Sequence, residues 1–514
     1  MSDLESGRRL VDALKDPACY PHEVARIELV ETHISWVLLT GPYAYKIKKP
    51  LRLDFLDFST LERRKRFCEE ELRINRRFAP ELYLDVLPIG GGPDAPRIGA
   101  TPAIEFCVRL RQFAPDAVLD RRVAGGRISG AEMRALAETI AHFHAEQPPI
   151  RREPAARAEA RANLDELARA LAAAGARYPL EAIAAWTEER LGALASAFDA
   201  RERAGAVREG HGDLHLENLV VLDGRIVPFD ALEFSLELRT ADVMDETAFL
   251  AMDLMAHRRT DLAFEFLNRY LEITGDYAGL DVLRFYLVYR ALVRAKVRAL
   301  KCVQAGRPQD VETNVVPYLE LAESLIRPRR PLLVITRGLS GSGKTHVTSG
   351  LVPRLPALRV RSDLERKRLH GVDADAHGAL AVGEGRYDAA ATDRTYAALA
   401  RAAEHALGAG IDVIADATFL SRPRRAAFRA LAARVAARFA ILDCVAPEPV
   451  LRERVKARAA ARSDASEATE AVLDAQLRSA EPLSSEEAPH AVEVDTSGPL
   501  DYDALAAKLA AVDA

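Results

Sequence analysis

The sequence predicts an α+β bilobal domain over residues 1–327 and an α/β domain with a mostly parallel sheet over residues 328–514. Several strand-like apolar runs lie within residues 24–115, whereas most of residues 129–325 shows helical patterns. Beyond residue 331, short β-branched runs alternate with helical segments. A strand-rich part followed by a helical part is typical of a bilobal arrangement, and strand–helix alternation is typical of a parallel sheet covered by helices on both faces.

The boundary near residue 328 rests on the segment Ile326–Pro331, which contains two prolines and three arginines. Proline disfavours helix at the residue before it, so the helical pattern ends here and a strand pattern begins. The length of 514 residues agrees with this division, because roughly 150 residues per domain gives two to four domains.

Individual elements follow from local pattern. In the first domain, a helix is expected from Leu61 to about Phe78, with Ser59 and Glu62 in the spacing of a capping box. In the second domain, five apolar runs are expected to form the strands: residues 332–336, 357–361, 411–415, 438–444 and 491–495.

Composition and charge exclude several classes of protein. The formal net charge is −5, which disfavours a dedicated duplex-DNA binder, and no nucleic-acid surface is expected. The five cysteines lie far apart without a C-x-x-C pair, which fits a reducing compartment and neither a zinc site nor a disulfide framework. No signal-peptide core and no apolar run of about 18 residues is seen, so we expect a cytoplasmic protein without membrane contact. The oligomeric state is left open.

The strongest motif runs from Gly338 to Thr345 and matches G-x-x-x-x-G-K-[ST] in full, between a strand pattern and a helix pattern. Backbone N–H groups of such a loop surround phosphate oxygens, and the following helix N-terminus favours negative charge. Lys344 is expected to reach the β- and γ-phosphates, and the Thr345 hydroxyl to bind Mg²⁺. The alternative is a glycine-rich turn with an incidental Lys-Thr. The expected nucleotide-binding residues are Gly338, Ser340, Gly341, Ser342, Gly343, Lys344 and Thr345.

Two carboxylates follow strands of this domain. Asp416 ends the third predicted strand and could hold Mg²⁺ through water, or simply cap the following turn. Asp363 follows the second strand, where strand ends line the ligand crevice, and could orient or deprotonate an acceptor hydroxyl with Arg361 as an anion clamp. The alternative for Asp363 is a helix N-cap.

Arg454 and Arg458 lie four residues apart and therefore share one helix face. They are expected to neutralise the charge of the transferring phosphate, unless they belong to a solvated helix surface. With GLSGSGKT, RSDLERKRLHG, VIADATFL and RERVKAR, residues 331–500 resemble the P-loop small-molecule kinases, a group within the P-loop NTPase fold. The resemblance implies ATP binding and leaves the acceptor undetermined.

The first domain carries H-x-D-x-x-x-x-N from His211 to Asn218. Kinase-type transfer needs a carboxylate near the acceptor hydroxyl, a role for Asp213, and an oxygen ligand for Mg²⁺ five residues later, a role for Asn218. Asp230 follows an apolar strand 17 residues after Asp213 and is expected to be the second metal ligand, with Glu233 as a possible helper.

A lysine for the α- and β-phosphates is expected on the strand upstream. Lys46 is preferred and Lys48 is the second choice, with a solvated basic edge strand as the alternative. Its partner carboxylate is expected on the next helix, where Glu71 lies on the apolar stripe and Glu70 is a close competitor.

These residues resemble the aminoglycoside phosphotransferase and choline kinase branch of the protein-kinase-like fold, over about residues 20–320. The chain departs from the protein-kinase pattern in one respect, because only Gly41 precedes the lysine strand where a glycine-rich loop would lie. Asp242 and Asp245 are expected to brace the catalytic loop, or to be helix-start carboxylates.

The sequence therefore predicts an enzyme with two modules that use ATP and Mg²⁺ to transfer the γ-phosphoryl group to a hydroxyl of a small-molecule acceptor. The alternative is a regulator in which the first module senses a ligand and the second hydrolyses ATP as a switch. A scaffold with two degenerate folds is disfavoured, because the key residues of both motifs are intact.

Overall fold

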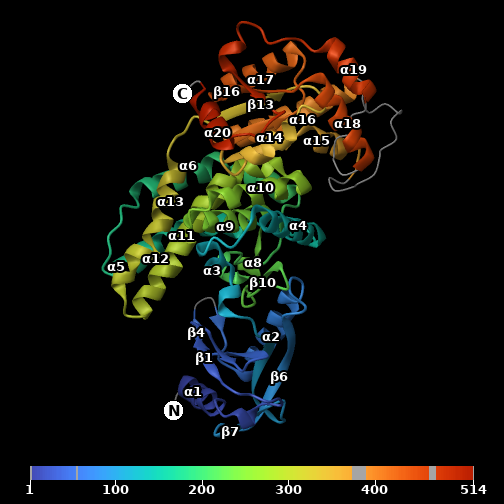
Figure 1. The fold of residues 1–514 in the computed structure, drawn as a ribbon. Helices are drawn as coiled ribbons and strands as arrows, with labels where there is room; N and C mark the ends of the chain where they lie inside the picture. Colours follow the sequence, from blue (N-terminus) through green and yellow to red (C-terminus); the bar gives the residue numbers. More distant parts are fainter. Residues whose placement is uncertain (1–2, 54–55, 373–388, 462–469, 513–514) are drawn as a thin grey trace. The chain divides into compact units, whose positions relative to one another are not determined.

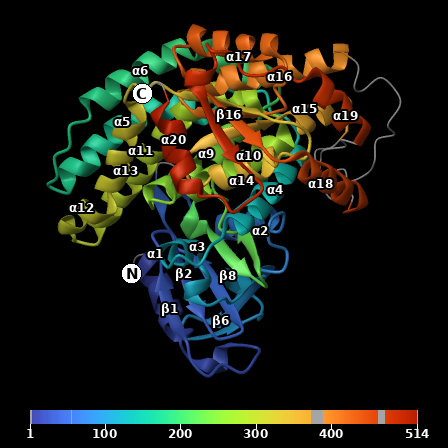
Figure 2. The same cartoon turned by 45° about the horizontal axis from the view of Figure 1, so that its top comes forward.

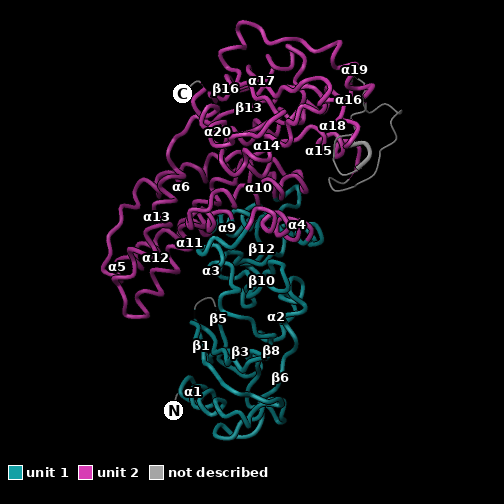
Figure 3. The backbone as a smooth tube through the Cα atoms, viewed as in Figure 1, with its two compact units in different colours: residues 1–128, 143–158, 202–250 teal, residues 129–142, 159–201, 251–514 magenta. Residues whose placement is uncertain are grey.

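The computed structural model describes residues 3–53, 56–372, 389–461 and 470–512. The chain divides into two compact units, shown in different colours in Figure 3. Unit 1 comprises residues 1–128, 143–158 and 202–250, and unit 2 comprises residues 129–142, 159–201 and 251–514. Helices that precede the proline-rich segment thus belong to the same compact unit as the C-terminal sheet. The domain boundary near residue 328 stays a prediction.

A six-stranded antiparallel sheet forms one half of unit 1 (Figure 1), and its strand order is β1-β2-β3-β8-β6-β7. Aliphatic and aromatic side chains of β2 and β3 pack with those of the N-terminal helix α1 (Asp3–Ala13) in one buried cluster. The strands are β1 (Glu28–Glu31), β2 (Ser35–Leu39), β3 (Tyr43–Lys48), β6 (Tyr83–Gly92), β7 (Ala95–Ile98) and β8 (Ala103–Arg111).

Helix α2 (Leu61–Asn75) packs against β8 and β6 and ends slightly before the predicted Phe78. Its N-cap is Thr60, whose hydroxyl accepts a hydrogen bond from the Arg63 backbone N–H. The capping box predicted at Ser59 is wrong by one residue, because the Ser59 hydroxyl donates to Asp57 instead.

The other half of unit 1 brings two distant loops together. Strand β10 (Leu219–Leu222) pairs antiparallel with β11 (Arg225–Pro228) through a tight turn at Asp223 and Gly224. The register places Leu219 opposite Pro228, so the loop before β10 and the loop after β11 lie at the same end of the hairpin. A second short pair, β9 (Val207–Glu209) with β12 (Thr240–Asp242), brackets this segment.

Unit 2 contains the five-stranded parallel sheet that the strand–helix alternation predicts. The strand order is β14-β15-β13-β16-β17, so the first strand in sequence lies at the centre. The order reverses on either side of β13, and ligands bind at such a reversal beyond the carboxyl ends of the strands. The strands are β13 (Leu332–Arg337), β14 (Ala357–Arg361), β15 (Asp412–Asp416), β16 (Arg438–Val445) and β17 (Ala491–Asp495), within one residue of the predicted ranges.

Alternate residues of a strand face opposite sides of its sheet, and helices pack on this sheet (Figure 2). Leu332 and Val334 join a buried cluster with side chains of α14 (Lys344–Leu351) and α20 (Tyr502–Ala511). Helices α16 (Ala389–Gly408) and α17 (Arg422–Arg434) also pack on the sheet, α16 against β15 and α17 against β13 and β16.

Long helices that precede the sheet in sequence complete unit 2, and α10 (Thr260–Thr274) packs directly against β14. Within the described residues, no helix is both long and apolar enough to cross a membrane. The remaining longer helices are α4 (Gly130–Glu146), α5 (Ala155–Ala173), α6 (Glu181–Ala193), α7 (Ala195–Arg203), α9 (Val243–Ala256), α11 (Leu280–Gln304), α13 (Val316–Ile326), α15 (Ser362–Leu369), α18 (Glu448–Ala461) and α19 (Glu470–Ser479).

Replacing Leu351 by alanine is expected to lower the free energy of unfolding of unit 2 by about 2–5 kcal/mol, because its fully buried side chain would leave a cavity under α14. Leu369→Ala is the matched control, since Leu369 is 43% exposed and should change stability by no more than about 0.5 kcal/mol. Denaturant unfolding of the full chain measures both. Equal losses for the two variants would contradict the packing described.

Candidate active sites

Lys46, on the central strand β3, reaches two carboxylates at once. Its ammonium lies 2.8 Å from Glu71 of α2 and donates a hydrogen bond to Asp230. Burial alone would lower the pKa of Lys46, but Asp230 and Glu71 outweigh burial and raise it well above its ordinary value. The lysine therefore stays charged, and it joins the strand, the helix and the loop after β11 at one point.

The apolar stripe of α2 predicts that Glu71, and not Glu70, faces inward, and Glu71 is indeed buried. Glu70 pairs with Arg73 and Arg239, whereas Glu71 is fully buried between the two lysines. Lys48, the second choice for the phosphate lysine, is fully buried as well and lies 2.8 Å from Glu71. Lys46 and Lys48 thus share one carboxylate.

Lys48 also donates to Glu233, so the cluster holds two ammonium groups and three carboxylates. The formal excess of one negative charge suits a site that receives a cation. Burial disfavours the charged form of Glu71, but the neighbouring Lys46 and Lys48 still lower its pKa. At Glu233 burial raises the pKa.

Asp213 and Asn218 converge as the H-x-D-x-x-x-x-N spacing predicts. The Asn218 amide nitrogen donates to the Asp213 carboxylate at 2.8 Å and to the Asp213 carbonyl at 3.0 Å. Because the nitrogen is used in this way, the amide oxygen of Asn218 remains as the atom for a cation. The Phe229 N–H donates to the Asn218 carbonyl at 3.0 Å, which ties the catalytic loop to the residue before Asp230.

Asp230 adopts a left-handed backbone conformation with φ of 60°, which is uncommon for a residue with a side chain. Its N–H donates to the Tyr83 hydroxyl at 3.0 Å, and the next N–H, of Ala231, donates to the Asn75 amide oxygen at 2.9 Å. These two bonds, from β6 and from the end of α2, hold the strained turn. Sequence reasoning did not identify Tyr83 or Asn75, because their role depends on tertiary contact.

The candidate catalytic loop, residues 211–218, is braced by Glu246. Its carboxylate accepts hydrogen bonds from the Gly212 N–H at 2.8 Å, from the His211 N–H, and from the His144 ring at 2.6 Å. Asp242 caps the start of α9 by accepting from Met244, which is the helix-start alternative. Glu246, next to Asp245 in sequence, was not among the residues that the sequence indicated for this role.

Backbone conformation shapes the phosphate loop between β13 and α14. Gly338 and Gly341 have positive φ, and a Cβ at either would lie about 2.5 Å from a backbone oxygen, of Cys444 and Leu451 respectively. Lys344 donates to the carbonyls of Gly338 and Leu339 at 2.9 and 2.8 Å, so its ammonium lies across the loop. Ser340 and Ser342 are buried within the loop, and Gly343 precedes α14.

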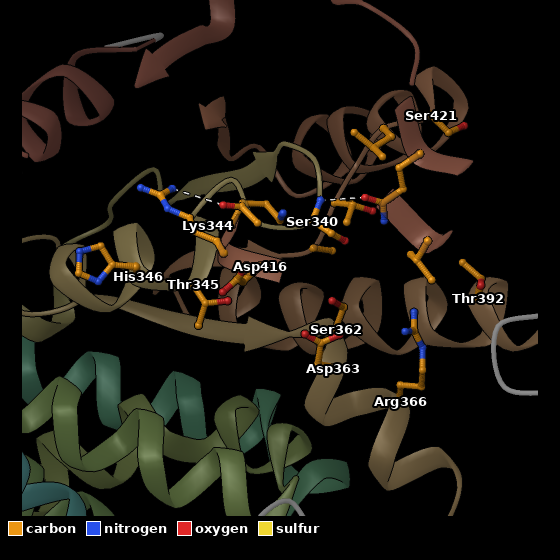
Figure 4. Close-up of a pocket in the computed structure, with 18 of the residues that line it drawn as sticks. Ser340, Lys344, Thr345, His346, Ser362, Asp363, Arg366, Thr392, Asp416 and Ser421 are labelled. Atoms are coloured by element: carbon orange, nitrogen blue, oxygen red, sulfur yellow. Dashed lines mark hydrogen bonds between the residues drawn. The ribbon is translucent and has the colours of Figure 1, made fainter. Parts of the chain in front are cut away.

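The loop opens into a cavity of about 920 Å³ at the carboxyl ends of β13, β14 and β15 (Figure 4). Thr345, Asp416 and Asp363 all line it, and Figure 4 shows Thr345 beside Asp416. Asp416 accepts from the Thr348 hydroxyl at 3.0 Å. Asp363 lies in the first turn of α15, whose N-cap is Arg361, so the alternative of Asp363 as the N-cap is wrong.

The arginines that line the cavity come from different helices and have different contacts. Arg454 lines it and donates to Thr496 and, at 3.3 Å, to the Gly341 carbonyl. The Arg458 side chain lies outside the described residues. Arg366 of α15, rather than Arg361, is among the lining residues, as is Arg424 of α17, whose guanidinium lies 4.5 Å from the Tyr396 ring centroid.

Both donor sets fit Mg²⁺, which prefers oxygen ligands and keeps several waters. Asn218 and Asp230 offer an amide oxygen and a carboxylate in unit 1, and Thr345 and Asp416 offer a hydroxyl and a carboxylate in unit 2. No cluster of three or more His, Cys, Asp or Glu side chains suited to a metal occurs among the described residues.

Two family models match separate ranges of the chain. The family model described as "Phosphotransferase enzyme family" matches residues 55–281, and an "AAA domain" model matches residues 333–483. The uncharacterized proteins Rv2004c of Mycobacterium tuberculosis and Mb2027c of Mycobacterium bovis are each 32% identical over 476 residues, covering 90% of this chain and 93% of theirs. The chain belongs to the same family as these mycobacterial proteins, with a kinase-like phosphotransferase fold followed by a P-loop kinase domain.

Two of the similar solved structures each cover part of the chain. A choline/ethanolamine kinase family protein from Mesorhizobium loti is 14% identical with a TM-score of 0.39, over 63% of this chain and 95% of its own. A gluconokinase from Sinorhizobium meliloti is 23% identical with a TM-score of 0.25, over 35% of this chain and 94% of its own. The two family matches support a phosphotransferase.

Stability is expected to fall in acid through Glu246. Burial raises its pKa, but the hydrogen bond and charge of His144, the charge of His211 and the hydrogen bond from the Gly212 N–H together outweigh burial and hold the pKa at about 2, below the ordinary 4.5. The Glu246 carboxylate binds a proton more weakly in the folded state than in the unfolded state. Its contribution to the free energy of unfolding is therefore complete above pH 4.5 and is lost as the pH falls toward 2. Glu246→Gln should remove roughly 3 kcal/mol at pH 7 and flatten the unfolding profile over this window. The exposed Glu312→Gln is the control, and a parallel, unflattened profile for Glu246→Gln would contradict the assignment.

Proposed function

We propose that the chain is an enzyme with two ATP- and Mg²⁺-dependent phosphotransferase modules, each acting on a hydroxyl of a small-molecule acceptor. The observation that carries the proposal is that unit 1 holds both the Asp213–Asn218 pair and the Lys46–Glu71–Asp230 cluster. The hydrogen bond from the Phe229 N–H to the Asn218 carbonyl joins the loop of the pair to the residue before Asp230. A bound triphosphate needs a lysine, a metal carboxylate and a second metal oxygen together, and a structural role would not require this combination.

In the first module, Asp213 is the group that receives the proton of the acceptor hydroxyl. The acceptor oxygen then bonds to the γ-phosphorus while the bond to the β–γ bridging oxygen breaks, leaving ADP. Lys46, oriented by Glu71, would exchange its contact with Asp230 for the α- and β-phosphates. Mg²⁺ held by Asn218 and Asp230 would neutralise charge on the transferred group.

In the second module, the backbone of residues 338–345 would hold the phosphates, with Lys344 moving from its loop carbonyls to the β- and γ-phosphates. Thr345 and Asp416 would hold Mg²⁺, and Asp363 would orient or deprotonate the acceptor. Arg454, and with it Arg458 by sequence spacing, would neutralise phosphate charge.

The wall of this cavity that lies beyond Asp363 favours an acceptor with an anionic group. Arg366 and Arg424 reach the cavity from two different helices, α15 and α17, and hydroxyls of Thr392 and Ser421 accompany them. Guanidinium groups recognise carboxylate and phosphate oxygens in pairs, and hydroxyls suit a hydroxylated ligand.

Asp213→Asn is expected to lower ATP turnover by the first module ~10²–10⁴-fold, because it removes the proton acceptor. The new amide oxygen can still accept the hydrogen bond from Asn218. Turnover is measured with the full chain in a Lys344→Ala background, with and without a metabolite pool as acceptor source. Asp223→Asn in the exposed β10–β11 turn is the matched control and should leave turnover unchanged. In the chain that keeps Lys344, acceptor-independent turnover that is unchanged by Asp213→Asn would favour the regulator instead.

Lys344→Ala is expected to weaken ATP binding by the second module ~10- to 100-fold, because the charge-assisted contact to the phosphates is lost. Equilibrium binding of a fluorescent ATP analogue to the full chain in an Asp230→Ala background reports this module alone. Lys508→Ala, an exposed lysine on α20, is the control. Undiminished binding by Lys344→Ala would show that the loop does not hold the nucleotide.

A further inference from the structure

Helix α10 completes the edge of the parallel sheet through one side chain. The Asn268 amide nitrogen donates to the Ala357 carbonyl at 3.0 Å, and its amide oxygen accepts from the Arg359 N–H at 2.6 Å. Both partners belong to β14, which is the edge strand. A side-chain amide thus occupies the donor and acceptor positions that a sixth strand would fill. Asn268 is buried, so neither bond competes with bulk water.

One turn further along α10, Glu272 extends this contact by charge. Its carboxylate accepts from the Arg359 guanidinium at 2.9 Å, and both side chains are nearly buried. Arg368, near the end of α15, donates to the Glu272 carbonyl at 2.7 Å. The glycine that ends α10, Gly275, lies so close to Arg368 that an added Cβ would be 2.4 Å from its Nε. Helix α10 therefore holds the strand β14 and the helix α15 that follows it.

The contact continues to the candidate metal carboxylate. Arg359 also donates to the Ser349 hydroxyl at 2.6 Å and lies 3.5 Å from the Thr348 hydroxyl, both on the helix after the phosphate loop. Thr348 in turn donates to Asp416 at 3.0 Å. A continuous line of side chains thus runs from Glu272 through Arg359 and Thr348 to Asp416.

The elements held by α10 carry the acceptor side of the cavity. Asp363 and Arg366 lie on α15, directly after β14, and both line the cavity. The phosphate loop itself follows β13, which lies two strands away from β14. Displacement of β14 would therefore move Asp363 and Arg366 while leaving the backbone around the phosphates in place.

We propose that Asn268 and Glu272 are positioning residues for the P-loop cavity, through which a helix of the phosphotransferase-family range sets the acceptor wall and Asp416. Helix α10 lies inside residues 55–281, matched by that family, whereas the cavity belongs to the AAA-domain range. Helix α10 and the parallel sheet of unit 2 then act together, and residues 328–514 alone would lack the group that completes β14. The effect on turnover rests on the proposed function, whereas the effect on β14 does not.

Hydrogen exchange and turnover of the full chain test this proposal together. Asn268→Ala should increase amide exchange in residues 357–369 about fivefold or more, the factor expected for the net loss of one hydrogen bond. In an Asp213→Asn background, Lys344-dependent ATP turnover should fall ~10- to 100-fold, while affinity for a fluorescent ATP analogue stays within about twofold. Glu272→Gln is nearly isosteric and should change exchange and turnover in the same direction but by less. This variant provides the test if Asn268→Ala does not fold.

Asn163→Ala is the matched control. Asn163 is a buried asparagine of α5 in the same unit, and its amide has no hydrogen-bond partner in the part of the chain that the structure describes. Unchanged exchange in residues 357–369 for both α10 variants would overturn the proposal. So would an equal fall of analogue affinity and turnover, because that pattern indicates general destabilisation. If the chain shows no Lys344-dependent turnover, the proposed function of the second module is contradicted. Exchange in residues 357–369 alone then decides whether α10 holds β14.

Discussion

Burial of the Glu71 carboxylate is the constraint on which the kinase-like half depends. A buried charge must be paired, and Glu71 meets this requirement with two ammonium groups from neighbouring positions of one strand. Lys46 then reaches Asp230 and Lys48 reaches Glu233, so the loop after β11 is tied to the sheet at two points. The same pairs that satisfy a buried carboxylate therefore place the candidate metal ligand, and a nucleotide would enter a cluster that is already ordered.

The catalytic loop depends on a second buried carboxylate. Glu246 accepts from the consecutive backbone N–H groups of His211 and Gly212, and the left-handed conformation of Gly212 lets the chain turn toward Asp213. Side chains outside the motif thus supply the rigidity that phosphoryl transfer requires, because transfer depends on positioning more than on covalent chemistry. In the P-loop half the same need is met differently, by glycines whose backbone passes too close to neighbouring carbonyls for any side chain.

The role of α10 changes how the two halves relate. An open edge strand exposes unpaired backbone groups, and proteins commonly cover such an edge. Here the cover comes from a helix of the other family range, so the two family-matched regions meet in shared hydrogen bonds rather than at a linker. This arrangement offers a physical reason for the two parts to occur in one chain, because the edge strand β14 would otherwise lose the helix that covers it.

Local pattern alone determined the five parallel strands, the phosphate loop, the helix carrying Glu71 and the H-x-D-x-x-x-x-N loop, because each depends on residues close together in sequence and on period. It also favoured Glu71 over Glu70, since an inward stripe identifies which carboxylate is buried. Only the tertiary structure decided that Lys48 shares Glu71, that Tyr83 and Asn75 hold Asp230, that Glu246 braces Gly212, and that Asn268 completes β14. These partners are separated by tens of residues, and their pairing depends on which surfaces the packed sheets and helices bring together, which no local pattern records.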